Sequence, residues 1–161
     1  MASSLMGKFA TLIAATLFVA ACSSTDTTSG PTTDGSSVPL TKQEEFAQVV
    51  GDRVFFDLDS YTVRPEGMAT LQRQAEFLNQ NPSYTLRVEG HCDERGTREY
   101  NLALGERRAN AVRDALVSMG IDRSRLSTLS YGKDRPECAD ASENCWQRNR
   151  KGLSVLQGAG S

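Results

Sequence analysis

The feature that most constrains the fold is a change of hydrophobic period that repeats along residues 54–157. Segments in which every second residue is apolar, as in half-buried strands, alternate with segments in which apolar residues recur every three or four positions, as on one face of a helix. The strand pattern occurs in residues 54–58, 84–90, 125–131 and 153–157. In the first of these segments Val54, Phe56 and Leu58 are expected to face the core. The chain therefore predicts an α/β sandwich (α+β) in the order β-α-β-α-β-(α)-β, with a small mixed sheet and helices packed on one face.

The predicted helices have recognisable ends. The first begins at Pro65, a residue that the first turn of a helix tolerates, and it stops at Asn81-Pro82. The second ends at Gly120, which suits a left-handed C-terminal cap. A short helix or turn is expected at residues 145–150. The apolar stripe of the second helix consists of Ala109, Val112, Leu116 and Met119.

The N-terminal part of the chain has a composition that excludes a folded core. Lys8 is followed by an apolar run, residues 9–20, which is too short to span a bilayer as a helix and has the form of a secretory signal. The run ends in small residues before Cys22, a pattern that resembles the lipobox of bacterial lipoproteins, in which cleavage leaves the cysteine as an acylated N-terminus. An ordinary cleavage site with a coincidental cysteine is the alternative. We therefore expect a signal peptide over residues 1–21.

Residues 22–41 are expected to form a tether that begins with the acylated cysteine. Nearly all of them are Ser, Thr, Gly, Pro or Asp, so they cannot bury enough apolar surface to fold. A flexible chain of this length has a root-mean-square span of roughly 25 Å. Ser23, directly after Cys22, resembles the lipoproteins that are passed on to the outer membrane. We expect a lipid-anchored protein of the outer membrane whose folded part faces the periplasm.

Residues 42–161 are expected to form one domain, because their number suits a single core and they contain no internal repeat. The formal net charge of the chain is only −2, with 18 basic and 20 acidic residues. Proteins that bind nucleic acids concentrate many unpaired Lys and Arg side chains. The charge therefore argues against a nucleic-acid partner.

The densest polar chemistry lies in GHCDERGTREYNLALGERRANAV, residues 90–112. This stretch spans the end of the second predicted strand, a loop and the start of the second predicted helix. Polar groups at the carboxyl end of a strand and beside a helix N-terminus favour ligands, anions in particular. The stretch is therefore the expected position of a functional site.

The sequence gives little support to three catalytic or metal-binding roles for this stretch. Cys92 continues the inward register of its strand and is expected to be a small buried side chain rather than a nucleophile. His91 is the one histidine of the chain, and zinc would need at least two further ligands. Asp93 and Glu94 are adjacent, and no nucleophile with a base beside it lies near them. We expect no cofactor and no metal; the alternative function is a small periplasmic metal-dependent hydrolase that uses His91, Asp93 and Glu94.

The charges of the stretch fit a pocket for a zwitterion. An arginine fork binds a carboxylate through two parallel hydrogen bonds, while a nearby aspartate accepts from an ammonium group. Arg108 and Asp93 supply one of each; Arg108 is expected on the rim of the buried helix face and Arg107 in solvent. Asp59, just after the first strand, would add an acceptor if the first two strands are neighbours in the sheet.

Two further cysteines, Cys138 and Cys145, bracket a short polar loop in a compartment that should be oxidising, so a disulfide between them is expected. Closing so small a loop contributes less than about 3 kcal/mol, so the bond would fix the loop rather than hold the fold. Two reduced thiols in a mobile loop are the alternative.

Four motifs together resemble the OmpA-like peptidoglycan-binding domain family, and with the lipobox and tether the chain resembles the lipid-anchored members of that family. The motifs are FDLDSY (56–61), VEGHCDERGTREYNLALGERRANAV (88–112), SYGKDRP (130–136) and QRNRK (147–151). The resemblance implies a binding protein and not an enzyme, with the diaminopimelate residue of the peptidoglycan stem peptide as ligand. The positions that match the ligand-binding residues of the family are Asp59, Asp93, Thr97, Asn101, Leu104 and Arg108.

The resemblance also implies a cellular role: a non-covalent tether between the outer membrane and the cell wall, acting with Tol proteins in envelope integrity and cell division. Docking to a Tol partner could instead be the main role, with wall binding secondary. One departure from the family pattern concerns the fold. Gly152 stands where the closing strand usually has a larger residue, and glycine weakens a strand interior, so the pairing of that strand is less secure.

Overall fold

The computed structural model describes residues 40–158. The chain divides into two units, residues 1–37 and residues 38–161, and the described residues belong to the second. The predicted signal peptide, the predicted acylation site Cys22 and the predicted tether as far as residue 39 lie outside the described residues. None of the helices within the described range is long and apolar enough to cross a membrane.

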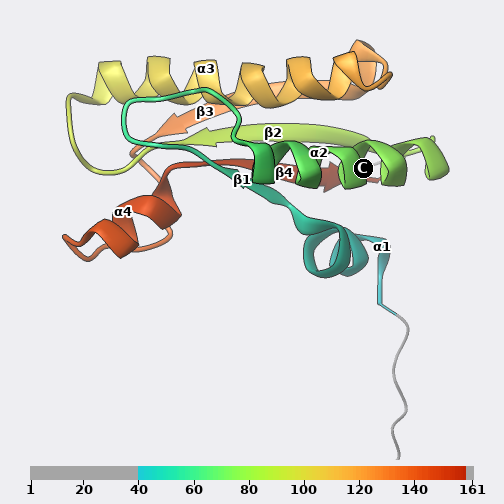
Figure 1. Ribbon diagram of the computed structural model, residues 1–161, viewed down its shortest axis with the longest axis horizontal. Helices are drawn as coiled ribbons and strands as arrows, with labels where there is room; N and C mark the ends of the chain where they lie inside the picture. The colour runs from blue at the N-terminus through green and yellow to red at the C-terminus, as the bar shows by residue number, and fades with distance from the viewer. Residues whose placement is uncertain (1–39, 159–161) are drawn as a thin grey trace, which may run out of the picture. The chain divides into compact units, whose positions relative to one another are not determined.

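The described residues form a four-stranded mixed sheet with helices, as predicted (Figure 1). The strand order is β1-β4-β2-β3; β4 runs antiparallel to β1 and β2, and β2 runs parallel to β3. The elements in chain order are α1 (Lys42–Glu45), η1 (Phe46–Gly51), β1 (Arg53–Phe55), α2 (Pro65–Gln80), β2 (Thr85–His91), α3 (Arg98–Ser118), η2 (Arg123–Arg125), β3 (Leu126–Gly132), α4 (Glu143–Asn149) and β4 (Lys151–Gln157).

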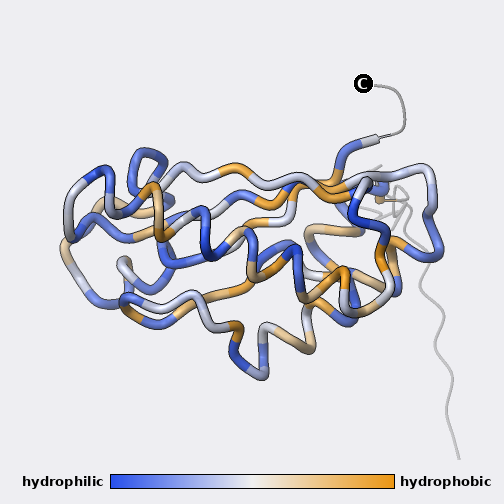
Figure 2. Tube along the Cα trace, turned by 90° about the horizontal axis from the view of Figure 1, so that it is seen from above, coloured by the Kyte–Doolittle hydropathy of each residue, from blue (hydrophilic) through white to orange (hydrophobic). Residues whose placement is uncertain are grey.

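The main core lies between the sheet and the two long helices, which contact each other and cover one face of the sheet (Figure 1). α3 packs on β2 and β3, and α2 packs on β1. Hydrophobic and hydrophilic residues follow one another at short intervals along the helical turns (Figure 2), as expected of helices that bury one side. Buried core residues from the helices include Leu71, Leu78, Val112 and Leu116. The predicted start at Pro65 is confirmed, and Gly120 has the left-handed φ of +92° expected of a cap.

The first strand is shorter than predicted. It ends at Phe55, and although Val54 and Phe56 are buried as expected, Leu58 is 57% exposed, so its predicted inward orientation is wrong. After Phe56, whose N–H donates to the Arg150 carbonyl, the chain leaves the sheet and turns at Asp59, a non-glycine residue with a left-handed φ of +54°. The alternation of buried and exposed residues that is typical of a strand therefore ends before Leu58.

A helical segment before β1 was not anticipated. Thr41 caps α1 through a reciprocal pair of hydrogen bonds with Glu44, the arrangement called a capping box. The chain continues into η1, where Phe46 and Val50 are buried and the Phe46 ring packs edge-on against Phe77, with ring centroids 5.2 Å apart. The sequence feature that could have predicted this helix is the spacing of Thr41 and Glu44 directly before an apolar run.

Close backbone approach explains the glycines of the central strands. A Cβ on Gly90 of β2 would overlap the carbonyl oxygen of Gly105 in α3, so the two glycines let this helix lie directly on the sheet. Gly152, expected to weaken β4, is paired on both sides, with Val54 and with Gly90. A Cβ at position 152 would lie 2.9 Å from Val112 of α3, so the small residue is required by packing, and the concern about this strand is not supported.

Candidate ligand-binding site

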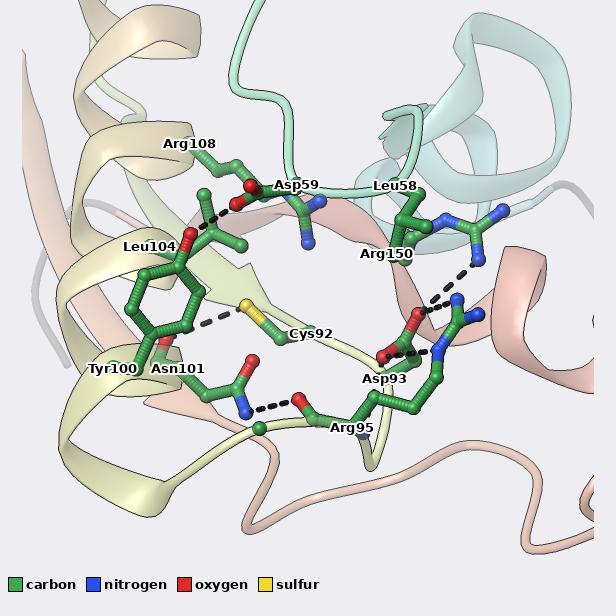
Figure 3. Close-up of a pocket in the computed structure, with 11 residues that line it drawn as sticks. Leu58, Asp59, Cys92, Asp93, Arg95, Tyr100, Asn101, Leu104, Arg108 and Arg150 are labelled. Carbon is green, nitrogen blue, oxygen red and sulfur yellow. Dashed lines mark hydrogen bonds and ion pairs between the residues drawn. The ribbon is translucent and has the colours of Figure 1, made fainter.

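A cavity of about 260 Å³ opens where the β2–α3 loop, the start of α3, the β1–α2 loop and the end of α4 meet (Figure 3). Three arginines and two aspartates line it, so the formal charge of the lining is +1. The lining residues are Leu58, Asp59, Cys92, Asp93, Arg95, Gly96, Tyr100, Asn101, Leu104, Arg108 and Arg150. Such a concave site with few convergent charged groups is typical of small-ligand binding.

The structure brings together the predicted ligand-binding residues with one exception. Asp59, Asp93, Asn101, Leu104 and Arg108 line the cavity. Thr97 is not part of its lining; it is the N-cap of α3, where its hydroxyl oxygen accepts a hydrogen bond of 3.2 Å from the backbone N–H of Tyr100. In this structure Thr97 therefore positions the helix that carries Asn101, Leu104 and Arg108.

Arg108 is fully buried, with 0% of its surface exposed, so the prediction that it lies on a rim is wrong. Its Nε donates to the carbonyl of Ser60 at 2.8 Å, one Nη to that of His91 at 2.8 Å and the other Nη to that of Asp57 at 3.0 Å. Burial lowers the pKa of this guanidinium, although Cys92 and Asp93 oppose the shift. The protein tolerates this buried positive charge because carbonyl dipoles replace the water around the guanidinium.

Arg108 still keeps donors for a ligand. A guanidinium has five N–H groups, and three of them donate to carbonyls among the described residues. One N–H on each Nη is therefore left, and Arg108 lines the cavity. The neighbouring Arg107 is exposed, as predicted, with its guanidinium 5.6 Å from the Tyr61 ring centre.

Asp93 is the acid at the other side of the cavity, and it is buried. Its oxygens accept from the side chain and backbone of Arg95 and from the Nη1 of Arg150 at 3.2 Å. Burial raises the pKa of Asp93, but the hydrogen bonds from Arg95 and Arg150 outweigh burial and hold the pKa below its usual value. The carboxylate is therefore charged at neutral pH.

Arg150 is a lining residue that was not selected from the sequence. Only 3% of it is exposed, and besides Asp93 it donates to the Phe56 carbonyl at 3.2 Å, to Glu143 at 2.6 Å and to Gln147 at 2.5 Å. It follows α4 directly and joins that helix to the cavity. Its place in the QRNRK motif is the sequence feature that could have identified it.

Asp59 reaches the cavity by a route that differs from the predicted one. β1 and β2 are not neighbours, because β4 lies between them. The loop after β1 instead carries Asp59 to α3, where its carboxylate accepts a hydrogen bond from the Tyr100 hydroxyl (Figure 3). This hydrogen bond raises the pKa of Tyr100.

Cys92 forms part of the cavity wall and is almost fully buried, as its strand register predicted. Its thiol donates to the Asn101 carbonyl, with sulfur and oxygen 3.3 Å apart. Burial raises the pKa of the thiol to about 11. A thiol in this state is a poor nucleophile at neutral pH.

The residues of the hydrolase alternative do not share a cavity. Asp93 lines the 260 Å³ cavity, Glu94 lines a separate one of about 130 Å³, and His91 lines neither. The His91 ring is buried against Tyr131, with ring centroids 5.5 Å apart. Within residues 40–158 no group of three or more His, Cys, Asp or Glu side chains could hold a metal ion.

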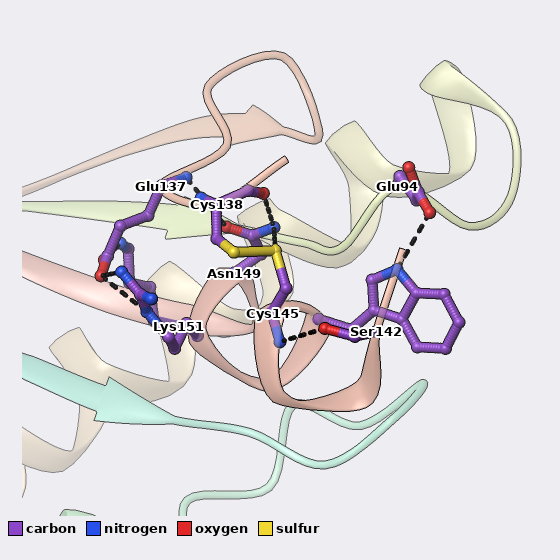
Figure 4. Close-up of a disulfide and its surroundings, with 9 residues drawn as sticks. Glu94, Glu137, Cys138, Ser142, Cys145, Asn149 and Lys151 are labelled. Carbon is purple, nitrogen blue, oxygen red and sulfur yellow. Dashed lines mark hydrogen bonds and ion pairs between the residues drawn. A yellow bond between two sulfur atoms is a disulfide. The ribbon is translucent and has the colours of Figure 1, made fainter. Parts of the chain in front are cut away.

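Cys138 and Cys145 are joined by a disulfide beside the smaller cavity (Figure 4). Asn149 at the end of α4 holds the same loop: its amide donates to the Cys138 carbonyl at 2.7 Å and accepts from the Glu137 N–H at 2.8 Å. Trp146, directly after Cys145, donates from its ring N–H to Glu94 at 3.0 Å. Through the contact between Trp146 and Glu94, α4 and the disulfide loop thus support the β2–α3 loop.

Comparisons with known proteins agree with this architecture. The sequence model of the OmpA family matches residues 55–150. The peptidoglycan-associated lipoprotein of Agrobacterium fabrum is 53% identical, over 78% of this chain and 71% of that protein, and the protein of the same name from Mesorhizobium japonicum is 47% identical, over 97% and 100%. The crystal structure of the peptidoglycan-associated lipoprotein from Burkholderia pseudomallei superposes with a TM-score of 0.66 at 39% identity, over 69% of this chain and 96% of that one. The C-terminal domain of Helicobacter pylori MotB, 22% identical with a TM-score of 0.63 over 68% of this chain and 86% of that one, shares the fold.

Proposed function

The chain belongs to the OmpA family, and from that membership we propose that it is a lipid-anchored protein that binds peptidoglycan non-covalently and tethers the outer membrane to the cell wall. It is a binding protein and not an enzyme. Relatives named for an association with peptidoglycan support the wall as its ligand. In this proposal the membrane attachment is the acylated Cys22, with the tether bridging the distance to the folded part.

The ligand that fits the cavity is the diaminopimelate residue of the stem peptide. The observation that carries this proposal is that Arg108 and Asp93, of opposite charge, line one cavity. The free end of diaminopimelate carries both a carboxylate and an ammonium group. The two remaining N–H groups of Arg108 suit the carboxylate, Asp93 suits the ammonium group, and Asp59 and Asn101 add polar contacts.

Tol proteins of the periplasm and inner membrane are the proposed protein partners, in envelope integrity and cell division. This part of the proposal rests on the resemblance described for the sequence. Wall binding rather than partner docking is the function that the cavity supports, because its size and charge suit a small zwitterion.

Sedimentation with purified cell walls tests the function. Residues 38–161 are suitable as a soluble fragment, because they form one unit with its own core. The fragment should sediment with walls that contain diaminopimelate and remain in the supernatant with walls that contain lysine, which lacks the second carboxylate. Equal sedimentation with both walls, or with neither, would overturn the proposal.

A further inference from the structure

The acid that should receive the ligand's ammonium group is already occupied in this structure. One oxygen of Asp93 accepts from the Arg95 backbone N–H at 3.2 Å and from its Nε at 3.3 Å. The other oxygen accepts from the Arg95 Nη2 at 2.5 Å and from the Arg150 Nη1 at 3.2 Å. Figure 3 shows both guanidinium groups directed at this carboxylate. A ligand cation must therefore replace one of them.

The two arginines differ in how firmly they are held. Arg150 is buried and has three further acceptors, on Phe56, Glu143 and Gln147, so its position is fixed. The Arg95 side chain is 35% exposed, and its fork on Asp93 is its one side-chain hydrogen-bonding contact among the described residues. Arg95 is therefore the group that can leave.

A second position for the Arg95 guanidinium lies next to the first. Its Nη2 is 4.0 Å from a carboxylate oxygen of Glu143, a side chain that is 65% exposed. The guanidinium carbon lies 4.2 Å from the ring centre of Trp146, and the Trp146 ring is itself fixed by its hydrogen bond to Glu94. Because the flat ring supports a cation at either position, a small rotation would move Arg95 from Asp93 to Glu143.

We propose that Arg95 is an internal counter-ion that competes with the ligand's ammonium group for Asp93, and so determines which ligands the cavity accepts. This inference rests on the proposed function and deepens it. In the free protein Arg95 and Arg150 together provide charged donors to both oxygens of the buried carboxylate, which offsets the cost of its burial. In the complex the ammonium group takes that place and Arg95 pairs with Glu143, so a ligand without a cation cannot displace it.

Removing Arg95 should tighten binding, which is the opposite of the effect expected of a direct ligand contact. The matched control is Arg98→Ala, because Arg98 lies in the same segment, is 61% exposed and pairs with Asp134 at 2.7 Å, away from the cavity. Both variants lose one positive charge, so the comparison removes any general electrostatic effect on an anionic peptide. Relative to Arg98→Ala, Arg95→Ala should bind tighter by a factor on the order of five, the size expected for a partly exposed ion pair.

The experiment is calorimetric titration of residues 38–161 with two forms of a diaminopimelate-containing stem peptide, one with the free side-chain amine and one with that amine acetylated. Arg95→Ala should tighten binding of the free amine and leave binding of the acetylated peptide unchanged, because the acetylated peptide does not compete for Asp93. Equal or weaker binding of the free amine by Arg95→Ala, or equal tightening for both peptides, would overturn the inference while the proposed function stands. If no protein, wild type included, binds either peptide, the proposed function fails and the inference fails with it.

Discussion

At the scale of single residues, Arg108 serves both the fold and the site. Its three hydrogen bonds to carbonyls join the β1–α2 loop to the end of β2, and the same residue lines the cavity. Sequence periodicity distinguished it correctly from Arg107, because successive helix positions differ by about 100° in direction. The depth of its burial could not be predicted, because the covering loop is irregular and comes from a distant part of the sequence.

Arg108→Ala should lower the free energy of unfolding by roughly 3 kcal/mol, because three carbonyl groups lose a charged donor at once. Arg107→Ala should change it by less than about 0.5 kcal/mol, since Arg107 is exposed. Urea denaturation of the 38–161 fragment measures both values. Equal stabilities for the two variants would show that the carbonyl contacts of Arg108 contribute little to the fold.

The thiol of Cys92 provides a second test at this scale. Because the thiol is buried and its pKa is raised to about 11, labelling by maleimide at pH 7 should be slow in the folded protein and fast in urea. The disulfide takes up Cys138 and Cys145, so Cys92 is the one free thiol of residues 40–158. Rapid labelling without denaturant would contradict the placement of Cys92 in the cavity wall.

At the scale of elements, helix ends were more predictable than strand ends. Pro65 and Gly120 mark their helices through backbone chemistry that acts locally. β1 ends before Leu58 because the chain turns towards α3. This turn depends on tertiary packing, which the local alternation of apolar residues does not reveal. The role of Gly152 was equally hidden, because the clash that forbids a side chain there comes from Val112, forty residues away in the sequence.

Gly90→Ala tests how closely α3 lies on the sheet. The new methyl group would overlap the Gly105 carbonyl, so helix and sheet must separate, and we expect a loss of about 3 kcal/mol in the free energy of unfolding, the upper end for overpacking. Gly158→Ala is the control, because no atom lies within 4 Å of a Cβ there. If thermal or urea denaturation finds Gly90→Ala as stable as this control, the described contact between α3 and β2 is too close.

At the scale of the whole molecule, the stability should depend on pH through a buried histidine. Burial lowers the pKa of His91, Lys151 lowers it further, and Glu89 partly offsets both. A base with a lower pKa in the folded protein binds fewer protons there than in the unfolded chain, so falling pH favours unfolding from about pH 6.5 downward. The free energy of unfolding should therefore be smaller at pH 5.5 than at pH 7.5.

The matched measurement is urea denaturation of wild type and His91→Phe at both pH values. The variant keeps an aromatic ring beside Tyr131 but cannot take up a proton, so its stability should change less across this range. Asp93 and Glu137, whose pKa values are lowered, should contribute a further loss only below about pH 4.5. Identical pH dependence for the two proteins would contradict the assignment to His91.

Much of the candidate site could be predicted because its central residues lie in one continuous stretch between a strand and a helix. Asp93, Asn101, Leu104 and Arg108 all lie there. Arg150 could not be found by that reasoning, because it reaches the cavity only when β4 inserts between β1 and β2. The hydrogen bonds from Arg95 to Asp93 could not be predicted either. Loops have no regular repeat from which the direction of a side chain follows.

The central claim is that Arg108 binds the second carboxylate of diaminopimelate. Measuring the binding of two ligands to three proteins tests it most directly. Calorimetry would compare stem peptides with diaminopimelate or lysine on wild type, Arg108→Lys and Arg107→Lys, with urea denaturation to confirm folding. Wild type and Arg107→Lys should prefer diaminopimelate by a factor on the order of thirty, the range for losing one partner of a buried charge pair. In Arg108→Lys the preference should fall to a few-fold, because an ammonium group cannot form the paired hydrogen bonds. An unchanged preference in a folded Arg108→Lys, or no preference in wild type, would contradict the account.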